Sequence, residues 1–315
     1  MLPNNDHTCG WINELPKRTN INKFQGQTSC DWIIIGAGYT GLSAARQLGN
    51  MNPNMNIIVV DAQVAGEGAS SRNSGYLVES TMNDGFVSSR NTKDYKTKCD
   101  LYSLGIKKVK KFITQHQVDC DWNECGKYYA SSKIEDEKKL TRFNNVLSSL
   151  KIKNQILYKD ELLSRLGTEF YNIGIYTNGG VLLNPGKLAR SMVDSLPENV
   201  TLYENSPLLD WEVINKKINC TLTGGTIKAS SIIFCANGFL SSLGIEKQYC
   251  FPLLLTASMT RKLTDNEFDL IGSPSEWGVL SIRPMGATVR MTKDRRILIR
   301  NTVSLHKNYT NIKKN

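Results

Sequence analysis

Residues 31–45 have the sequence Asp31-Trp-Ile-Ile-Ile-Gly-Ala-Gly-Tyr-Thr-Gly-Leu-Ser-Ala-Ala45, in which an apolar run leads into three glycines. The run 32–35 is rich in β-branched residues and ends at glycine, which predicts a strand buried on both faces. Gly36, Gly38 and Gly41 have the spacing G-x-G-x-x-G, and the small residues after them predict a helix. The first glycine permits a sharp turn, the second lets the backbone approach a pyrophosphate, and the third lets the helix lie close to the sheet. The positive end of the helix dipole would then face the phosphates.

A second strand and an acidic residue follow. The run 56–60 predicts a strand, and Asp61 comes after it, about 20 residues beyond the last glycine, where dinucleotide-binding folds carry a carboxylate for the ribose hydroxyls. The alternative is a glycine turn with an unrelated surface aspartate, but strand, loop, helix, strand and acid all occur in the expected order. The segment 30–61 therefore predicts a Rossmann-like unit that binds an adenine dinucleotide. Further candidate cofactor-binding residues lie beside these motifs: Tyr39, Thr40 and Ala62.

The composition is that of a globular protein. With 315 residues, 40% of them hydrophobic, the chain can bury a large core, and two domains are expected. The formal net charge of +10 would suit nucleic acid, an anionic membrane or an acidic partner. However, most lysines fall on the expected solvent faces of helices, and no aromatic-rich nucleic-acid motif accompanies them. We therefore expect no nucleic-acid partner, and the sequence does not indicate an oligomeric state.

The sequence also argues against membrane insertion and metal binding. No run is as long and apolar as a membrane span, and residues 1–23 lack the apolar core of a signal peptide, so a cytoplasmic protein is expected. Eight cysteines are present without a C-x-x-C pair, and only three histidines could complete a metal site. We expect reduced structural thiols, no metal site and no stable membrane insertion.

Residues 66–75 form a second glycine-rich stretch, Gly66-Glu-Gly-Ala-Ser-Ser-Arg-Asn-Ser-Gly75. It contains small hydrogen-bonding residues and one fixed cation, Arg72. A loop of this kind can wrap a polar cofactor with backbone N–H groups, and the alternative is a flexible surface loop. The candidate cofactor-binding residues here are Ser70, Ser71, Arg72, Asn73, Ser74 and Gly75.

Later segments predict further elements. Apolar residues recur at helical spacing in 98–117 and 134–150, and Asn184-Pro185 is typical of a helix start. Residues 126–132 predict a strand. Residues 209–229 predict an antiparallel meander with a turn at Gly224-Gly225, followed by a separate strand at 231–236.

Three motifs together resemble those of a known family: GAGYTGLSAA at 36–45, VVDA at 59–62 and GxGASSRNSG at 66–75. They are similar to the FAD-dependent amine and amino-acid oxidoreductases of the D-amino-acid oxidase/glycine oxidase superfamily, particularly its gamma-glutamylputrescine oxidoreductase-like group. The segments Cys235-Ala-Asn-Gly-Phe239 and Arg283-Pro-Met-Gly286 agree with this resemblance. It implies an α/β fold in which a Rossmann-like FAD-binding domain of the glutathione-reductase type is interleaved with an α+β, mixed-sheet substrate domain. The implied boundaries are an N-terminal arm (1–28), an FAD-binding domain (29–92 and 181–247) and a substrate domain (93–180 and 248–315).

The resemblance also implies a cofactor and a reaction. FAD would be held by the motifs above, by backbone near Leu208 and by the stretch Ala236, Asn237 and Gly238. The reaction would oxidise the C–N bond of a small-molecule amine or amino acid, by hydride transfer to flavin N5, to an imine that hydrolyses. Arg72 and Asn73 are the best candidates for positions near the isoalloxazine, and no catalytic acid or base is identified.

Other polar and aromatic residues leave alternatives open. Arg283 and Arg290 could bind a substrate carboxylate, but we favour surface charges on strands. Tyr128, Tyr129 and Met259 could line the substrate side, but we favour positions partly in the core.

The chain departs from the family pattern at its C-terminal end. Relatives are expected to continue with a late strand, a glycine-rich loop near the flavin pyrimidine and a closing helix, so a C-terminally truncated chain is expected. Two alternative functions follow: a catalytically inactive FAD- or nucleotide-binding remnant, and an NAD-dependent dehydrogenase that shares the Rossmann start. The substrate, the electron acceptor and the mode of flavin attachment cannot be read from the sequence.

Overall fold

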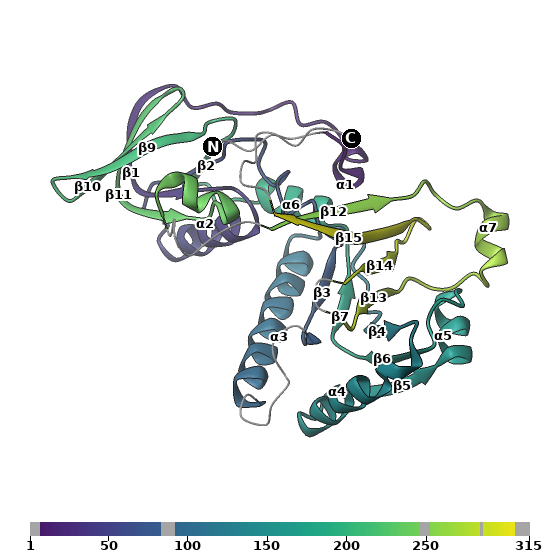
Figure 1. The fold of residues 1–315 in the computed structure, drawn as a ribbon. Helices are drawn as coiled ribbons and strands as arrows, with labels where there is room; N and C mark the ends of the chain where they lie inside the picture. The colour runs from purple at the N-terminus through teal and green to yellow at the C-terminus, as the bar shows by residue number, and fades with distance from the viewer. Residues whose placement is uncertain (1–6, 83–91, 246–252, 284–285, 306–315) are drawn as a thin grey trace. The chain divides into compact units, whose positions relative to one another are not determined.

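The computed structural model describes residues 7–82, 92–245, 253–283 and 286–305, and the chain divides into two compact units (Figure 1). The first unit comprises Met1–Asn73, Pro185–Leu254 and Ser304–Asn315. The second comprises Ser74–Asn184 and Leu255–Val303. The chain therefore leaves the first unit at Ser74 and returns to it at Pro185.

A six-stranded sheet of order β8-β2-β1-β11-β10-β9 forms the first unit. Its β1 strand pairs in parallel with β2 and β11, and β2 pairs in parallel with β8, while β9, β10 and β11 form an antiparallel meander. Ile33, Ile34 and Ile35 at the end of β1 are buried, as expected for the run 32–35, and all four residues of β2 are buried as well. The bounds are β1 (Gly26–Ile35), β2 (Ile57–Val60), β8 (Val200–Tyr203), β9 (Leu208–Ile214), β10 (Lys217–Leu222) and β11 (Gly225–Phe234).

The predicted helix after the glycine motif is confirmed as α2 (Tyr39–Met51). It buries the small residues Gly41, Ala45 and Gly49 together with Leu42, so the helix can lie close to the sheet. The helix predicted at Pro185 is also confirmed, as α6 (Pro185–Asp194). The first unit is completed by α1 (Gly10–Asn13) and the 3-10 helix η4 (Asn237–Leu243).

One strand differs from the sequence prediction. The expected meander strand and the expected separate strand at 231–236 are a single strand, β11, which pairs with β10 along its first half and with β1 along its whole length. The predicted division was wrong because no glycine or proline interrupts the chain between Ala229 and Ser231. The turn predicted around Gly224 does join β10 to β11.

The second unit contains a seven-stranded sheet of order β12-β15-β14-β13-β4-β6-β5 and a two-stranded ribbon of β3 and β7. The large sheet is mixed, because β13 and β4 are parallel while β4, β6 and β5 are antiparallel. The bounds are β3 (Tyr76–Val78), β4 (Lys127–Ser131), β5 (Asn154–Tyr158), β6 (Ile173–Thr177), β7 (Gly180–Leu182), β12 (Leu253–Met259), β13 (Gly278–Ser281), β14 (Thr288–Met291) and β15 (Ile297–Leu305).

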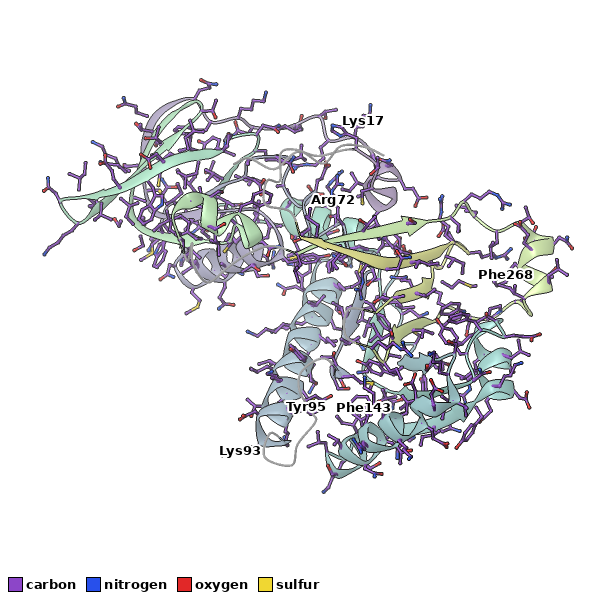
Figure 2. The ribbon with its side chains drawn as sticks, in the orientation of Figure 1. Lys17, Arg72, Lys93, Tyr95, Phe143 and Phe268 are labelled. Atoms are coloured by element: carbon purple, nitrogen blue, oxygen red, sulfur yellow. The ribbon has the colours of Figure 1, made fainter. Side chains whose placement is uncertain are left out.

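Helices cover this sheet and confirm two predictions. The helix expected at 98–117 is α3 (Thr92–Gln115), and that expected at 134–150 is α4 (Glu137–Ser149), preceded by the 3-10 turn η3 (Ile134–Asp136). Tyr95 of α3 and Phe143 of α4 belong to one buried cluster (Figure 2). The remaining helices are α5 (Lys159–Leu166) and α7 (Asp265–Leu270).

Within the described residues, no helix is both long and apolar enough to cross a membrane. In the same part of the chain, no group of three or more histidine, cysteine, aspartate or glutamate side chains is placed to hold a metal ion.

Candidate functional site

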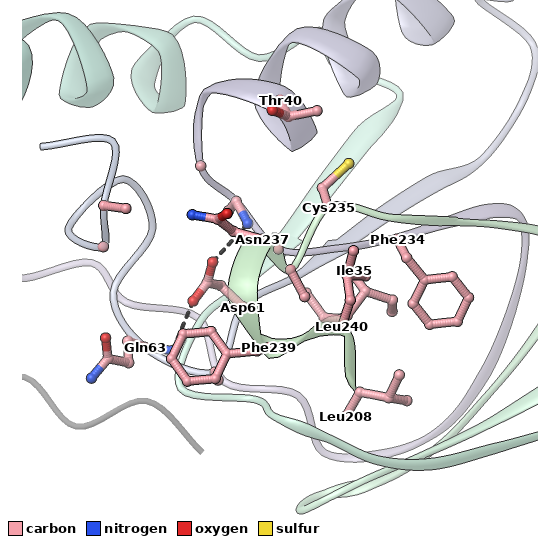
Figure 3. Close-up of a pocket in the computed structure, with 18 of the residues that line it drawn as sticks. Ile35, Thr40, Asp61, Gln63, Leu208, Phe234, Cys235, Asn237, Phe239 and Leu240 are labelled. Carbon is pink, nitrogen blue, oxygen red and sulfur yellow. Dashed lines mark hydrogen bonds between the residues drawn. The ribbon is translucent and has the colours of Figure 1, made fainter. Parts of the chain in front are cut away.

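A cavity of about 520 Å³ lies in the first unit where β1, β2 and β11 end (Figure 3). The carboxyl ends of parallel strands are the usual ligand site of an open α/β sheet. The lining comes from the glycine loop, the end of β2, the loop 66–70, the start of β9, and the end of β11 with η4.

The glycine loop leaves no room for side chains. Gly36 has φ +106°, and a Cβ there would lie 2.6 Å from the carbonyl oxygen of Cys235. A Cβ on Gly41 would lie 1.8 Å from the carbonyl oxygen of Gly36, and one on Gly38 would lie 2.8 Å from Ser70 Oγ. Backbone therefore forms this wall of the cavity, and α2 begins at its edge with its first-turn N–H groups.

Asp61 is the charged group of the cavity. Its Oδ2 accepts a hydrogen bond from the backbone N–H of Ala37 at 2.6 Å, and its Oδ1 accepts one from Gln63 at 2.8 Å (Figure 3). Burial raises the pKa of Asp61, and the two backbone hydrogen bonds oppose that rise. A carboxylate has about four lone-pair sites, so these two bonds leave acceptors for a pair of ribose hydroxyls.

Apolar side chains form another part of the wall. They suit a flat purine ring, which gains from burial against aliphatic and aromatic groups. Together with the backbone wall and the Asp61 carboxylate, they give the cavity the donors, acceptors and apolar surface that an adenosine diphosphate group needs. These side chains include Ile35, Val60, Leu208, Phe234, Phe239, Leu240 and Leu243.

The loop 66–73 is held by its own hydrogen bonds and by the N-terminal segment. Arg72 Nε donates to the carbonyl of Glu67 at 2.9 Å, and Asn73 Nδ2 donates to that of Ser70 at 2.7 Å. Trp11, which is 5% exposed, donates from Nε1 to the carbonyl of Asn73 at 3.0 Å. The N-terminal segment therefore contacts the loop directly.

A buried ion pair extends this contact. Arg18 pairs with Glu204, which is 1% exposed and also accepts the backbone N–H of Ala65 at 2.7 Å. The start of the loop is thus tied to the end of β8 and to the N-terminal segment.

The structure brings most of the predicted cofactor residues together. Those that line the cavity are Gly36, Gly38, Tyr39, Thr40, Asp61, Ala62, Ser70, Leu208, Ala236 and Asn237. Those that do not line it are Gly41, Ser71, Arg72, Asn73, Ser74, Gly75 and Gly238.

Several lining residues were missed by the sequence reasoning. Ile35, Val60 and Phe234 end parallel strands, and that position was a usable signal. Phe239, Leu240 and Leu243 come from η4, a 3-10 segment without a periodic pattern that would have indicated it.

Among the residues considered for substrate contact, Arg290 departs from the prediction. It is 1% exposed, so the favoured surface charge was wrong, and its guanidinium binds backbone carbonyls instead. Tyr128 and Tyr129 are buried in hydrophobic clusters, which confirms core positions, and Met259 is half-buried. Arg283 is exposed, as expected, and lines a second cavity of about 780 Å³, largely apolar, in the second unit.

Ser70 stands in for a missing helix cap. The N-cap residue of α2 is Gly38, which offers no side-chain acceptor, and the backbone N–H of Tyr39 donates to Ser70 Oγ at 2.9 Å. Ser70→Ala should therefore lower the free energy of unfolding by about 1 kcal/mol, as the loss of a helix cap does. Urea unfolding measures this difference. Ser43→Ala on the exposed face of α2 is the control and should change stability by less than about 0.5 kcal/mol; an equal loss in both variants would contradict the assignment.

Known proteins are similar to this chain in sequence and in fold. The sequence profile of the family described as FAD dependent oxidoreductase matches residues 31–313. "Probable oxidoreductase OrdL" of Rhizobium meliloti is 26% identical over 240 residues, 73% of this chain and 54% of that protein. Gamma-glutamylputrescine oxidoreductase of Escherichia coli is 25% identical over 287 residues, 86% of this chain and 64% of that protein. The chain therefore spans between half and two thirds of the length of these relatives.

A solved structure has the same fold. Glycine oxidase from Geobacillus kaustophilus superposes with a TM-score of 0.71 at 18% identity, covering 89% of this chain and 72% of that one. The family match covers both described units, and the cavity provides the groups that the adenosine half of FAD requires. The chain belongs to the family of FAD dependent oxidoreductases.

Proposed function

We propose that the protein binds FAD in the cavity of its first unit and oxidises the C–N bond of a small amine or amino acid. The cavity is the observation that supports FAD binding, because a wall of glycine backbone, a buried carboxylate and an apolar surface meet there. The similarity to gamma-glutamylputrescine oxidoreductase supports an amine substrate and makes gamma-glutamylputrescine the first compound to test.

In this proposal the chain binds and orients the cofactor. The backbone of Gly36 to Gly41, with Tyr39 and Thr40, would hold the pyrophosphate at the α2 N-terminus, and Asp61 with Ala62 would hold the ribose. Leu208 and the stretch 236–238 would hold the adenosine and phosphates, and the loop Ser70–Gly75 would hold the flavin side. When bound, FAD supplies the hydride acceptor that converts an amine to an imine, which water hydrolyses.

The proposal includes the domain division and the location. Residues 29–92 and 181–247 would form the FAD-binding domain, and 93–180 with 248–315 the substrate domain, in a cytoplasmic protein. The substrate is a small molecule, and we assign no catalytic side chain.

The visible absorbance of the purified protein tests both FAD binding and the oxidation of a C–N bond. We expect a yellow protein, or a colourless one that takes up added FAD, with a flavin band near its usual visible position. Anaerobic addition of gamma-glutamylputrescine, and of a panel of amines and amino acids, should bleach that band. Release of an aldehyde or keto acid in proportion to the bleaching would identify the C–N bond as the one oxidised.

The alternatives give different results. A protein that binds FAD but is bleached by none of these compounds would be a catalytically inactive FAD-binding protein. A protein that takes up no FAD but quenches NADH fluorescence would be an NAD-dependent dehydrogenase. Either result overturns the proposed activity.

A further inference from the structure

Arg290 is a buried cation that the proposed chemistry does not use. It lies on β14 and is 1% exposed. Its Nη1 lies 2.8 Å from the carbonyl oxygen of Ser74, 3.0 Å from that of Gly75 and 2.9 Å from that of Leu183. Burying a guanidinium costs free energy unless such acceptors surround it, so this arrangement requires the three carbonyls to keep their positions.

The three carbonyls belong to the two places where the chain enters and leaves the second unit. Ser74 is the first residue of that unit, and Leu183 precedes its boundary residue Asn184. The backbone N–H of Leu183 also donates to the carbonyl of Gly75 at 2.9 Å. One guanidinium thus joins two chain segments that are more than a hundred residues apart in the sequence.

A carboxylate and an amide complete the network. Glu276 Oε2 lies 3.8 Å from Arg290 Nη2, and Glu276 Oε1 accepts a hydrogen bond from Asn123 Nδ2 at 3.2 Å. The backbone of Asn123 exchanges two hydrogen bonds of 2.9 Å with Leu182, beside the carbonyl that Arg290 binds. Burial lowers the pKa of Arg290 to about 10, so the guanidinium is still charged at neutral pH.

Ser74 and Gly75 are the last two residues of the glycine-rich loop that begins at Gly66. We propose that Arg290 is a positioning residue for FAD: by binding the carbonyls of Ser74, Gly75 and Leu183, it fixes the end of this loop. This inference rests on the proposed function only for the identity of the ligand, FAD. The hydrogen bonds from Arg290 to Ser74, Gly75 and Leu183 lie within the second unit and do not depend on which cofactor binds.

Two measurements on the full chain test this role. The first is amide hydrogen exchange without added FAD, in which Arg290→Met should speed exchange in residues 74–78 and at Leu183. Exchange in β6 of the same sheet should be unchanged. The second is FAD titration, in which the same variant should bind FAD about 10- to 100-fold more weakly, the range expected when hydrogen bonds to a charged donor are lost.

Arg300→Met is the matched control. Arg300 lies on the neighbouring strand β15, is half-buried, and donates from Nη2 to Thr288 Oγ1 at 2.7 Å. The Arg300→Met variant should leave both the amide exchange of residues 74–78 and the affinity for FAD unchanged. If Arg290→Met does not fold, Arg290→Lys replaces it, because a lysine retains the charge but lacks the planar fork that reaches Glu276 and the carbonyls together.

The outcomes separate this inference from the proposed function. Faster loop exchange with weaker FAD binding supports the positioning role. Unchanged exchange in residues 74–78 overturns it, and so does faster exchange with unchanged FAD affinity. Failure of the wild-type chain to bind FAD overturns the proposed function and the FAD part of this inference, while the exchange comparison still decides whether Arg290 holds the loop.

Discussion

Asp61→Asn should weaken FAD binding by about 100-fold or more. The carboxylate accepts the backbone N–H groups of Ala37 and Gln63, and an asparagine would direct an N–H₂ group toward one of these donors. The variant also removes the charged acceptor proposed for the ribose hydroxyls, and each hydrogen bond to a charged group contributes about 1.5–3 kcal/mol. Isothermal titration of the cofactor-free protein with FAD measures the change.

Asp31→Asn is the control for this substitution. Asp31 lies on β1, the strand that pairs with β2 just before Asp61, and its Oδ2 accepts the backbone N–H of Asn56 at 2.8 Å, outside the cavity. Like Asp61, Asp31 is a carboxylate that accepts a backbone hydrogen bond in this sheet, but it does not line the cavity. We expect its variant to keep the wild-type FAD affinity. Equal affinities for Asp61→Asn and Asp31→Asn would show that Asp61 does not bind the cofactor.

Lys127→Met should stabilise the protein near neutral pH. Lys127 lies on β4 with no measurable exposure, and its Nζ is 2.8 Å from Ser80 Oγ. Burial lowers the pKa of Lys127 from 10.5 to about 7, and Glu79 opposes this shift. At about 1.4 kcal/mol per pKa unit, the lysine costs on the order of 5 kcal/mol at neutral pH and below. Methionine has a similar length and removes that cost.

The pH dependence has a definite sign. Below pH 7 the lysine is protonated in both the folded and the unfolded chain, so its cost is full and constant. Between pH 7 and 10.5 only the unfolded chain keeps the proton, so the free energy of unfolding of the wild type rises with pH. Relative to Lys127→Met, the wild type should therefore be least stable below pH 7, and the difference should shrink toward pH 10.5. Urea unfolding at several pH values measures it.

Lys217→Met provides a matched comparison. Lys217 is also a strand lysine whose Nζ donates to a serine Oγ at 2.8 Å, in this case Ser230, but it is exposed. Its variant should change stability by less than about 0.5 kcal/mol at every pH. A Lys127→Met variant that behaves like Lys217→Met would contradict the assigned cost of burial.

Local patterns predicted the nucleotide end of the fold because its signals are close together in sequence. The glycines at 36, 38 and 41 and the carboxylate at 61 belong to one βαβ unit, and their spacing predicted a shared site; Gly36, Gly38 and Asp61 line the same cavity. The motif also implied the close approach of α2 to the sheet, which the buried face of that helix confirms.

Residues whose role depends on distant partners could not be predicted in this way. Arg290 binds carbonyls that lie 216, 215 and 107 positions away, and its strand context resembled that of an exposed charge. Lys127 sits in a strand whose five residues are all buried, and a lysine in the sequence gave no sign of that. Phe239, Leu240 and Leu243 of η4 were missed because the end of β11 brings them to the cavity and they have no sequence pattern of their own.

The pairing of β1 with β11 has a consequence for synthesis on the ribosome. Ile35 is the register partner of Phe234, and the first part of the second unit lies between them in the sequence. When β1, α2 and β2 have emerged, neither β8 nor β11 has been made, and both edges of that small sheet lack their neighbours. Such non-local pairing slows folding, and an unpaired strand edge is prone to aggregation. The early βαβ segment therefore stays an incomplete sheet until β8 and β11 have been synthesised. Protection of this segment by a chaperone would matter most before residues 200–234 leave the ribosome.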